Sequence, residues 1–444
     1  MDLSQGNIFS QLIIFALPLL AGQLFQSLYN SVDSIVIGNF EDANALAAVT
    51  ASATISLILS GFFNGMSAGA TAMFARLFGA KDHNNLHRAI QTTVLFSVLL
   101  GIILSALGII FTPALLEFTS CPPEVFELAV SYLRIYLIGV LFTSIYNIGA
   151  GVLRSVGDSQ SPFIFLVISS VMNIFLDLLF VAAFHMGVSG VAIATIISQC
   201  VSMVLVFIKM MRMDGSYRFS FKEIIMDWSL LGEVARLGFP AGLQTSLTAI
   251  SNLYVQQYIN SFSAVAIAGV GSAMKVDQFA GMFCFTLGLA MTTFIGQNLG
   301  AGRNDRAHKA VGVSALSCAV FVLIVCIPIY IYSPYLIRIF SPDMEVIMYG
   351  TGMLRVIMPL YLIMGMNGLF GGILRGFRYS ITSMICTLAG MVAVRQIWLY
   401  VTLTYFGHDI RFVYYGYPIG WICSLTPMLL IYFLHIRRKY PSKQ

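Results

Sequence analysis

The chain has 444 residues, 58% hydrophobic and only 10% charged, with a mean hydropathy of +0.86. Soluble domains carry about 25% charged residues, so 24 Lys and Arg with 19 Asp and Glu cannot cover a soluble fold of this length. The composition therefore predicts an integral membrane protein. The formal charge of +5 is small and lies in loops, which gives no indication of nucleic-acid binding.

Long runs without charge predict that the spans are helical. Ala89–Leu116 and Ala310–Ile337 contain no Asp, Glu, Lys or Arg, and a helix needs about 20 such residues to cross a bilayer. Leu178–Ile208 is also free of these residues and is long enough for two spans, with a turn near His185–Gly190. The alternating segments of a membrane β-barrel are missing from the sequence. We predict an all-α membrane protein.

Breaks at charged, Gly and Pro residues divide the chain into twelve predicted transmembrane helices. In chain order they are 8–37, 45–76, 88–111, 125–153, 161–184, 188–208, 234–262, 264–299, 310–333, 346–374, 380–405 and 412–436. Several of them exceed the length that the hydrocarbon core requires, which predicts tilted or kinked helices.

The positions of the basic residues predict the orientation of the chain. Of the 24 Lys and Arg residues, 18 lie after even-numbered spans or in the C-terminal tail. The loops after odd-numbered spans hold only Arg338 and Arg411. Because Lys and Arg accumulate in cytoplasmic loops, both termini are expected in the cytoplasm.

An internal repeat relates the two halves of the chain at an offset of 221 residues. ARLFGAKDHNNLHRAI from Ala75 aligns with GQNLGAGRNDRAHKAV from Gly296, and Gly151 and Arg154 align with Gly372 and Arg375. We predict an N-terminal six-helix lobe (1–208), a cytoplasmic linker (209–233), a C-terminal six-helix lobe (234–436) and a basic tail (437–444). Two parallel repeats of this kind are typical of secondary transporters, which bind substrate near the midplane and alternate its access.

Acidic residues inside the membrane are rare and costly, and the first half has two, Asp33 and Asp177. Both are predicted at one depth, where a shared cavity could bind H⁺ or, with the oxygen atoms nearby, Na⁺. Polar side chains at helical spacing precede each acid on the same face: Gln26, Tyr29 and Asn30 before Asp33, and Ser170 and Asn173 before Asp177. The alternative is that these groups only form hydrogen bonds between helices.

The second half differs in the charges of its spans. Span 8 carries Lys275 and Asp277, and span 11 carries Arg395. These groups either line a substrate cavity or pair structurally with other helices. Pro18 interrupts span 1, and the resulting kink is either static or a bending point that couples protonation of Asp33 to movement.

Signatures of other activities are missing from the sequence. It contains no G-x-x-x-x-G-K-[ST] loop for ATP and no H-E-x-x-H or G-x-S-x-G motif. We therefore expect neither an enzyme nor a bound cofactor.

Several segments resemble the multidrug and toxic compound extrusion (MATE) family. They are LPLLAGQLFQSLYNSVDSIVIGNF from Leu17, FGAKD from Phe78, LRSVGDSQSP from Leu153, NIFLD from Asn173, GVSGVAIATIISQ from Gly187 and GQNLGAG from Gly296. The resemblance covers nearly the whole chain. It implies twelve helices in two lobes and cation-coupled export of amphipathic, often cationic drugs.

Within that family the residues match the DinF-like branch. Asp33 and Asp177 correspond to its acidic pair, and Pro18 to its bending proline. The surrounding polar network corresponds to Gln26, Tyr29, Asn173 and Thr195. The NorM-like branch instead keeps acids in spans 7 and 10, where this sequence has Asn252 and no acid beyond Glu345 at the outer edge. The resemblance thus argues against a second-lobe Na⁺ site and leaves H⁺ and Na⁺ open as coupling ions.

The sequence as a whole predicts a monomeric multidrug antiporter of a prokaryotic plasma membrane. External H⁺ or Na⁺ would bind at Asp33 and Asp177, with Asn173 as a further Na⁺ ligand, and a cytoplasmic cationic drug would leave in exchange. The alternative is a lipid or lipid-linked oligosaccharide flippase of related architecture. Such a protein would recognise phosphate with basic residues in its cleft, for which Lys275 and Arg395 are the candidates.

Overall fold

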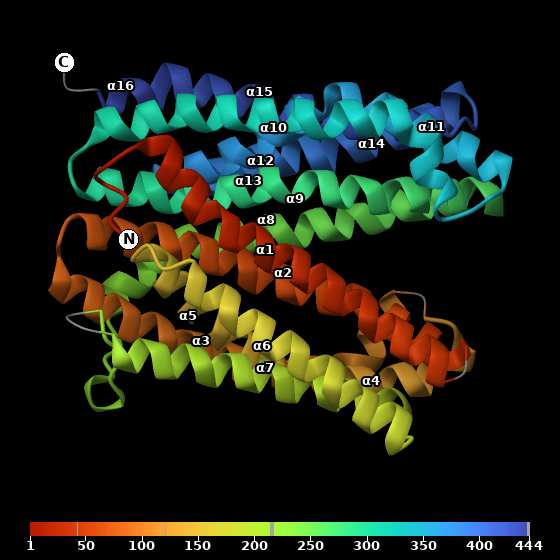
Figure 1. Cartoon of the computed structure of the whole chain (residues 1–444), viewed down its shortest axis with the longest axis horizontal. Coiled ribbons are helices and arrows are strands. Elements are labelled where there is room, and N and C mark those ends of the chain that lie inside the picture. Colours follow the sequence, from red (N-terminus) through yellow and green to blue (C-terminus); the bar gives the residue numbers. More distant parts are fainter. Residues whose placement is uncertain (42, 120, 214–216, 442–444) are drawn as a thin grey trace. The chain divides into compact units, whose positions relative to one another are not determined.

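The structure, a computed structural model, describes residues 1–41, 43–119, 121–213 and 217–441, without the side chains of residues 29–31, 34 and 43. Helices make up nearly all of this described part, which contains no β-strand (Figure 1). The prediction of an all-α protein is confirmed.

The helices follow the predicted spans closely. Those of the first half are α1 (Ile8–Phe40), α2 (Ala43–Gly79), α3 (His83–Phe118), α4 (Phe126–Ile138), α5 (Val140–Ser155), α6 (Gln160–Asp177) and α7 (Gly187–Arg212). Those of the second half are α8 (Trp228–Asn260), α9 (Ala264–Gly300), α10 (Asn304–Arg338), α11 (Met344–Ile357), α12 (Tyr361–Gly376), α13 (Ser380–Thr387), α14 (Arg395–Val401), α15 (Arg411–Ile431) and α16 (Arg437–Lys439). The additional helices arise where a bend at Gly139, or 3₁₀ or π-helical turns, divide a predicted span, and α16 lies in the predicted tail.

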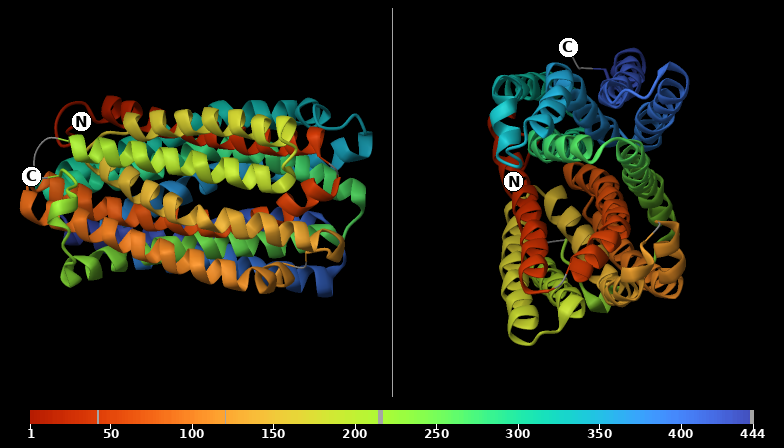
Figure 2. Two further views of the ribbon diagram at one scale, coloured as in Figure 1. Left: turned by 90° about the horizontal axis from the view of Figure 1, so that it is seen from below. Right: turned by 90° about the vertical axis from the view of Figure 1, so that its right-hand side faces the viewer.

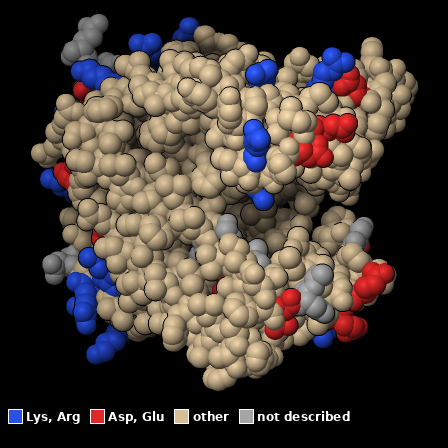
Figure 3. All heavy atoms as spheres, turned by 45° about the vertical axis from the view of Figure 1, so that its right-hand side comes forward, with Lys and Arg blue, Asp and Glu red and all other residues tan. Residues whose placement is uncertain are grey.

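By length and hydropathy, ten helical segments of the described chain could cross a membrane. The pair α4 and α5, bent by 41° at Gly139, makes eleven. α8 is 33 residues long but less hydrophobic, and with it the segments correspond to the twelve predicted spans. Most of the face drawn in Figure 3 is formed by uncharged residues, with broad areas that carry no Lys, Arg, Asp or Glu. Such areas suit contact with lipid tails.

The internal repeat is visible in the helix contacts. In the first half, the Thr71 hydroxyl of α2 donates to the carbonyl of Gly151 in α5, at 3.3 Å. At the repeat-related positions, the Thr292 hydroxyl of α9 donates to the carbonyl of Gly372 in α12, at 3.0 Å. Both pairs link helices whose backbones pass close to each other at a glycine, which small residues allow in membrane helices. The two halves therefore share packing as well as sequence.

The chain forms two compact units, each a bundle of helices running side by side (Figure 1, Figure 2). The first unit contains residues 1–2 and 17–242, and the second contains 3–16 and 243–444. The division therefore falls inside α1 and α8, close to Pro18 and Pro240. The predicted lobe and linker boundaries rest on the sequence repeat and stay a prediction; part of the linker and tail lies outside the described residues.

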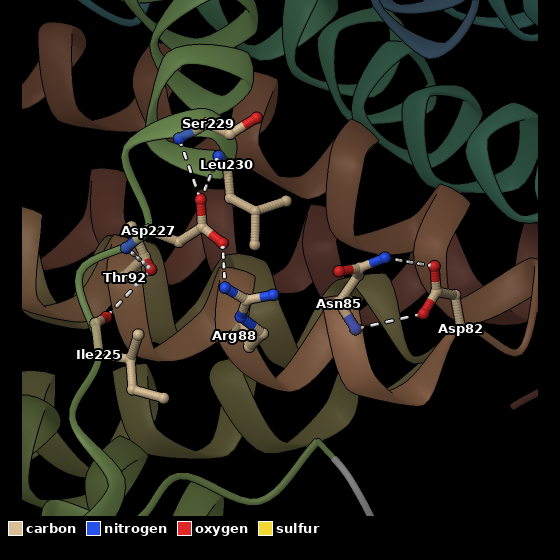
Figure 4. Close-up of polar contacts among 8 residues, drawn as sticks. All are labelled: Asp82, Asn85, Arg88, Thr92, Ile225, Asp227, Ser229 and Leu230. Carbon is tan, nitrogen blue, oxygen red and sulfur yellow. Dashed lines mark hydrogen bonds and ion pairs between the residues drawn. The ribbon is translucent and has the colours of Figure 1, made fainter.

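The predicted linker packs on α3 within the first unit (Figure 4). Asp227 accepts hydrogen bonds from the backbone N–H groups of Ser229 and Leu230, which caps the start of α8. Its other carboxylate oxygen lies 2.8 Å from the Arg88 guanidinium, and its own N–H donates to the Thr92 hydroxyl. Four contacts thus fix the entry of the chain into its second half.

In the second unit, Arg306 of α10 holds the N-terminal segment. Its guanidinium donates to the carbonyl groups of Leu3, Gln5 and Gly6 and to Oε1 of Gln11, at 2.7–3.2 Å. The side chain is 7% exposed and also lies over the Phe294 ring, 5.3 Å from its centre. The start of α1 is therefore anchored to the second unit, whereas residues 17–40 belong to the first.

Candidate functional site

The structure brings Asp33 and Asp177 together in the first unit. Asp33 lies seven residues before the end of α1, and Asp177 is the last residue of α6. The helix continues from Asp177 into a π-helical turn, η2 (Leu178–Ala183), a distortion that is frequent at functional sites. The two carboxyl groups lie beside each other, close enough to interact directly.

Polar atoms of this pair are buried without hydrogen-bond partners. Among the described residues, no partner meets Oδ1 of Asp33, either carboxyl oxygen of Asp177, or the side-chain amide of Asn173. Asn173 is 1% exposed and Asp177 fully buried, and Asn173 lies one helical turn before Asp177. Burying two adjacent carboxylates without donors is costly. A proton or a small cation held between them removes that cost.

Apolar side chains and two tyrosines surround the acids. Val36, Val181 and Val191 belong to the hydrophobic cluster at this end of the unit. Tyr132 of α4 lies close enough to both carboxyl groups to sense their charge and stacks on Tyr136, with ring centres 6.1 Å apart. Tyr132 and Tyr136 were not among the site residues predicted from the sequence. Their i, i+4 spacing inside a span was the signal that could have identified them.

The other predicted residues of this site are less closely tied to the acids. Gln26 is half-buried on α1. The Thr195 hydroxyl donates to the carbonyl of Val191, one turn earlier in α7, at 3.0 Å. The side chains of Tyr29 and Asn30 lie outside the described residues. The roles predicted for all four remain predictions.

In the second unit, Lys275 and Asp277 occupy different surroundings. Lys275 is exposed, with its ammonium 5.4 Å from the centre of the Phe340 ring. Asp277 has a buried Oδ1 with no hydrogen-bond partner among the described residues. Its backbone carbonyl accepts a hydrogen bond from the Tyr361 hydroxyl at 2.9 Å. The two side chains therefore do not form an ion pair, as their i, i+2 spacing predicts.

Arg395 is almost completely buried, at 2% exposure, directly after the π-helical segment η5 (Leu388–Val394). Its Nη2 donates to the Ser251 hydroxyl at 2.7 Å and to Oδ1 of Asn252 at 2.8 Å, both on α8. Gln396 also donates to Ser251. These contacts connect α8 to α14, the helices that correspond by repeat to α1 and α6.

Two helical repeats with ionisable groups inside apolar bundles are the architecture of a membrane transporter. The MatE family model matches the chain twice, over residues 18–179 and 240–401. The chain therefore belongs to the MatE family of transporters. The two matches start 222 residues apart, in agreement with the predicted repeat. The family resemblance predicted from the sequence is confirmed, and transporter membership is consistent with the expectation that the chain is not an enzyme.

Relatives and solved structures agree with this assignment. The chain is 28% identical over 394 residues to the probable multidrug resistance protein YpnP of Bacillus subtilis, covering 89% of this chain and 88% of the relative. It is 24% identical to the multidrug export protein MepA of Staphylococcus haemolyticus, covering 98% and 95%. Its fold matches a MOP superfamily transporter from Pyrococcus furiosus with a TM-score of 0.91 at 20% identity, covering 99% and 98%. The match to a multidrug resistance MATE family transporter in an outward-facing conformation has a TM-score of 0.89 at 21% sequence identity. It covers 99% of this chain and 97% of that structure.

The relatives also bear on localisation. They come from Bacillus and Staphylococcus, and the chain carries at least ten membrane-crossing helices among its described residues. It is a multi-pass protein, and a prokaryotic plasma membrane is its location.

Proposed function

We propose that this protein exports amphipathic, mostly cationic drugs in exchange for external H⁺ or Na⁺. The observation that carries the proposal is the adjacent carboxyl groups of the partly buried Asp33 and the fully buried Asp177. They lie beside an apolar cluster and near the amide of Asn173, which has no hydrogen-bond partner among the described residues. Such a pair accepts one positive charge favourably, and two carboxylates with an amide oxygen also suit Na⁺. The names of YpnP and MepA support drugs as the cargo.

In this mechanism, cation binding and drug binding alternate. External H⁺ or Na⁺ neutralises Asp33 and Asp177, which removes the negative charge that retains a cationic drug. α1 then rearranges, and Pro18 is the position at which it bends because a proline leaves one backbone carbonyl unpaired. The split of α1 supports this role, since residues 3–16 pack with the second unit and residues 17–40 with the first. A membrane potential supplies about 2.3 kcal/mol per 100 mV for each net charge moved, so exchange of one H⁺ for one monovalent drug draws on the concentration gradient alone.

The remaining parts of the proposal follow the sequence. Gln26, Tyr29, Asn30 and Thr195 complete the polar surroundings of the acids, as in the DinF-like branch. The protein works as a monomer with both termini in the cytoplasm. A flippase, the alternative predicted from the sequence, is retained as an outcome of the test below.

The test uses purified protein in liposomes that contain a fluorescent cationic drug. Drug flux is followed under a pH gradient alone and under a Na⁺ gradient alone, for the wild type, Asp33→Asn and Asp177→Asn. We expect one of the two gradients to drive drug flux in the wild type. Each substitution should reduce that flux to the level of liposomes without protein. Asp409→Asn is the matched control, because Asp409 lies in a loop and pairs with Arg411. Folded protein that moves no drug under either gradient, but scrambles a labelled lipid, would replace this proposal with the flippase.

A further inference from the structure

Arg395 lies in a cluster of the second unit that has the chemistry of a carboxylate-binding site. The hydrogen-bond and ring partners of its guanidinium among the described residues are neutral. Ser251 and Asn252 accept its hydrogen bonds, and the guanidinium carbon lies 5.6 Å from the centre of the Tyr417 ring. Nε has no hydrogen-bond partner among the described residues. A positive charge that is 2% exposed thus has no ion-pair partner within the described part of the chain.

An acid lies near this cluster, but it does not neutralise the arginine. Tyr417 is close enough to both Arg395 and Asp277 to sense both charges, yet no ion pair of the described chain joins the two. The ring centre of Trp421 lies 5.8 Å from that of Tyr361 and 6.4 Å from that of Tyr417. Burying a single charge is costly, and a buried pair is favourable only when it is hydrogen-bonded as a pair. Arg395 and Asp277 therefore each keep the capacity for a counter-charge from outside the protein.

The cluster has an accessible side. Asn252 is exposed and Tyr417 is half-buried, whereas Arg395 and Ser251 lie behind them. The amide oxygen of Asn252 accepts the Arg395 hydrogen bond at 2.8 Å, which is the contact that a carboxylate oxygen would make more strongly. Displacing this exposed amide gives a ligand access to the guanidinium.

We infer that Arg395, with Asn252 and Tyr417, binds the carboxylate of an amphipathic substrate that also carries a cationic group, for which Asp277 is the counter-charge. The inference rests on the proposed export function and specifies a substrate class for it. The half-buried ring of Tyr417, packed on the buried Trp421, is the aromatic contact for the apolar part of such a molecule. A phosphate dianion fits less well, because the cluster has one cation and an acid near it.

The internal repeat places this cluster where the first unit has its acids. α8 and α14 correspond to α1 and α6, Asn252 aligns with Asn30, and Trp398 aligns with Asp177. At equivalent helices, one unit therefore presents two carboxyl groups and the other presents a guanidinium. At these helices the charge of the second unit is therefore suited to an anionic group.

The test compares two dyes that differ only in the carboxylate. Rhodamine B has a free carboxylate and a cationic ring system, and its ethyl ester keeps the cation alone. Binding to purified full-length protein in detergent is measured by fluorescence anisotropy, and flux of both dyes in liposomes. We expect Arg395→Gln to weaken rhodamine B binding tenfold or more and to change ester binding less than twofold. Arg411→Gln, at an exposed arginine, is the matched control and should change neither.

Asn252→Asp tests the same idea without removing the arginine. The new carboxylate is isosteric with the amide and would pair with Arg395, so rhodamine B should again lose at least tenfold in affinity while the ester does not. Asn260→Asp adds the same charge to an exposed position of α8 and should leave the ratio of the two affinities unchanged. If Arg395→Gln fails to fold, Asn252→Asp and Asn260→Asp still test whether Arg395 binds the carboxylate of the dye.

The outcomes separate this inference from the proposed function. Variants that weaken both dyes equally, or neither, would show that Arg395 only connects α8 to α14. In that case the ester is still exported by the wild type and the proposed function stands. Wild-type protein that neither binds nor moves either dye would overturn the proposed function and this inference with it.

Discussion

Replacing Arg306 with alanine should release the N-terminal segment from the second unit. The guanidinium makes four hydrogen bonds to residues 3–11, three of them to backbone carbonyl groups. A hydrogen bond to a charged group contributes about 1.5–3 kcal/mol, but dehydrating a guanidinium that is 7% exposed opposes this gain. We expect the free energy of docking of the segment to fall by about 3 kcal/mol. The loss is smaller than the sum of the four hydrogen bonds, because the freed carbonyl groups can then bind water.

Hydrogen–deuterium exchange of a peptide covering residues 1–16 measures this loss directly. The Leu3 N–H donates to Oε1 of Gln297 at 2.8 Å, so its exchange reports docking. Since 1.4 kcal/mol corresponds to a factor of ten, Arg306→Ala should accelerate exchange about a hundredfold while exchange in α9 and α12 is unchanged. Arg306→Lys should have an intermediate effect, because an ammonium keeps the charge but not the planar set of donors.

Arg303→Ala is the matched control for this experiment. Arg303 is exposed and donates to the carbonyl of Ser4 at 2.8 Å, so its loss should accelerate exchange less than tenfold. Equal exchange in Arg306→Ala and Arg303→Ala would refute the conclusion that Arg306 anchors the start of α1.

Two further predictions concern packing and capping. A Cβ at Gly372 would lie 1.9 Å from the carbonyl oxygen of Gly288, whereas one at Gly312 would meet nothing within 4 Å. Gly372→Ala should therefore cost about 3 kcal/mol and lower the thermal unfolding midpoint in detergent, and Gly312→Ala should leave it unchanged or raise it; equal midpoints would contradict the close approach of α9 and α12. The pKa of Asp82 is lowered from 3.8 because the side-chain amide and backbone N–H of Asn85 donate to its carboxylate. Its cap on α3 is therefore fully present above about pH 4 and is lost as the pH falls through the lowered pKa. The wild type should lose stability relative to Asp82→Asn, a cap that does not titrate, when thermal unfolding is compared between pH 6 and pH 3; parallel curves would count against the cap.

The sequence alone determined the helices, the repeat and the acids of the first half. Membrane-spanning helices follow from hydropathy, which is a local property of about 20 residues. Asp33 and Asp177 could be identified because a charge inside an apolar run is rare and costly. The repeat at 221 residues could be read from aligned glycines, and the contacts of Thr71 and Thr292 confirm it.

Only the tertiary structure decided which side chains meet. Asp33, Asp177 and Tyr132 come from three helices, and Arg395 reaches Ser251 across 144 residues of sequence. Helical spacing gives the face on which a residue lies but not the rotation of that helix against its neighbours, which the packing of whole side-chain surfaces sets. The division of α1 beside Pro18 depends likewise on contacts of Arg306 with residues nearly 300 positions earlier. The roles of single residues in transport therefore depend on geometry that no local pattern contains.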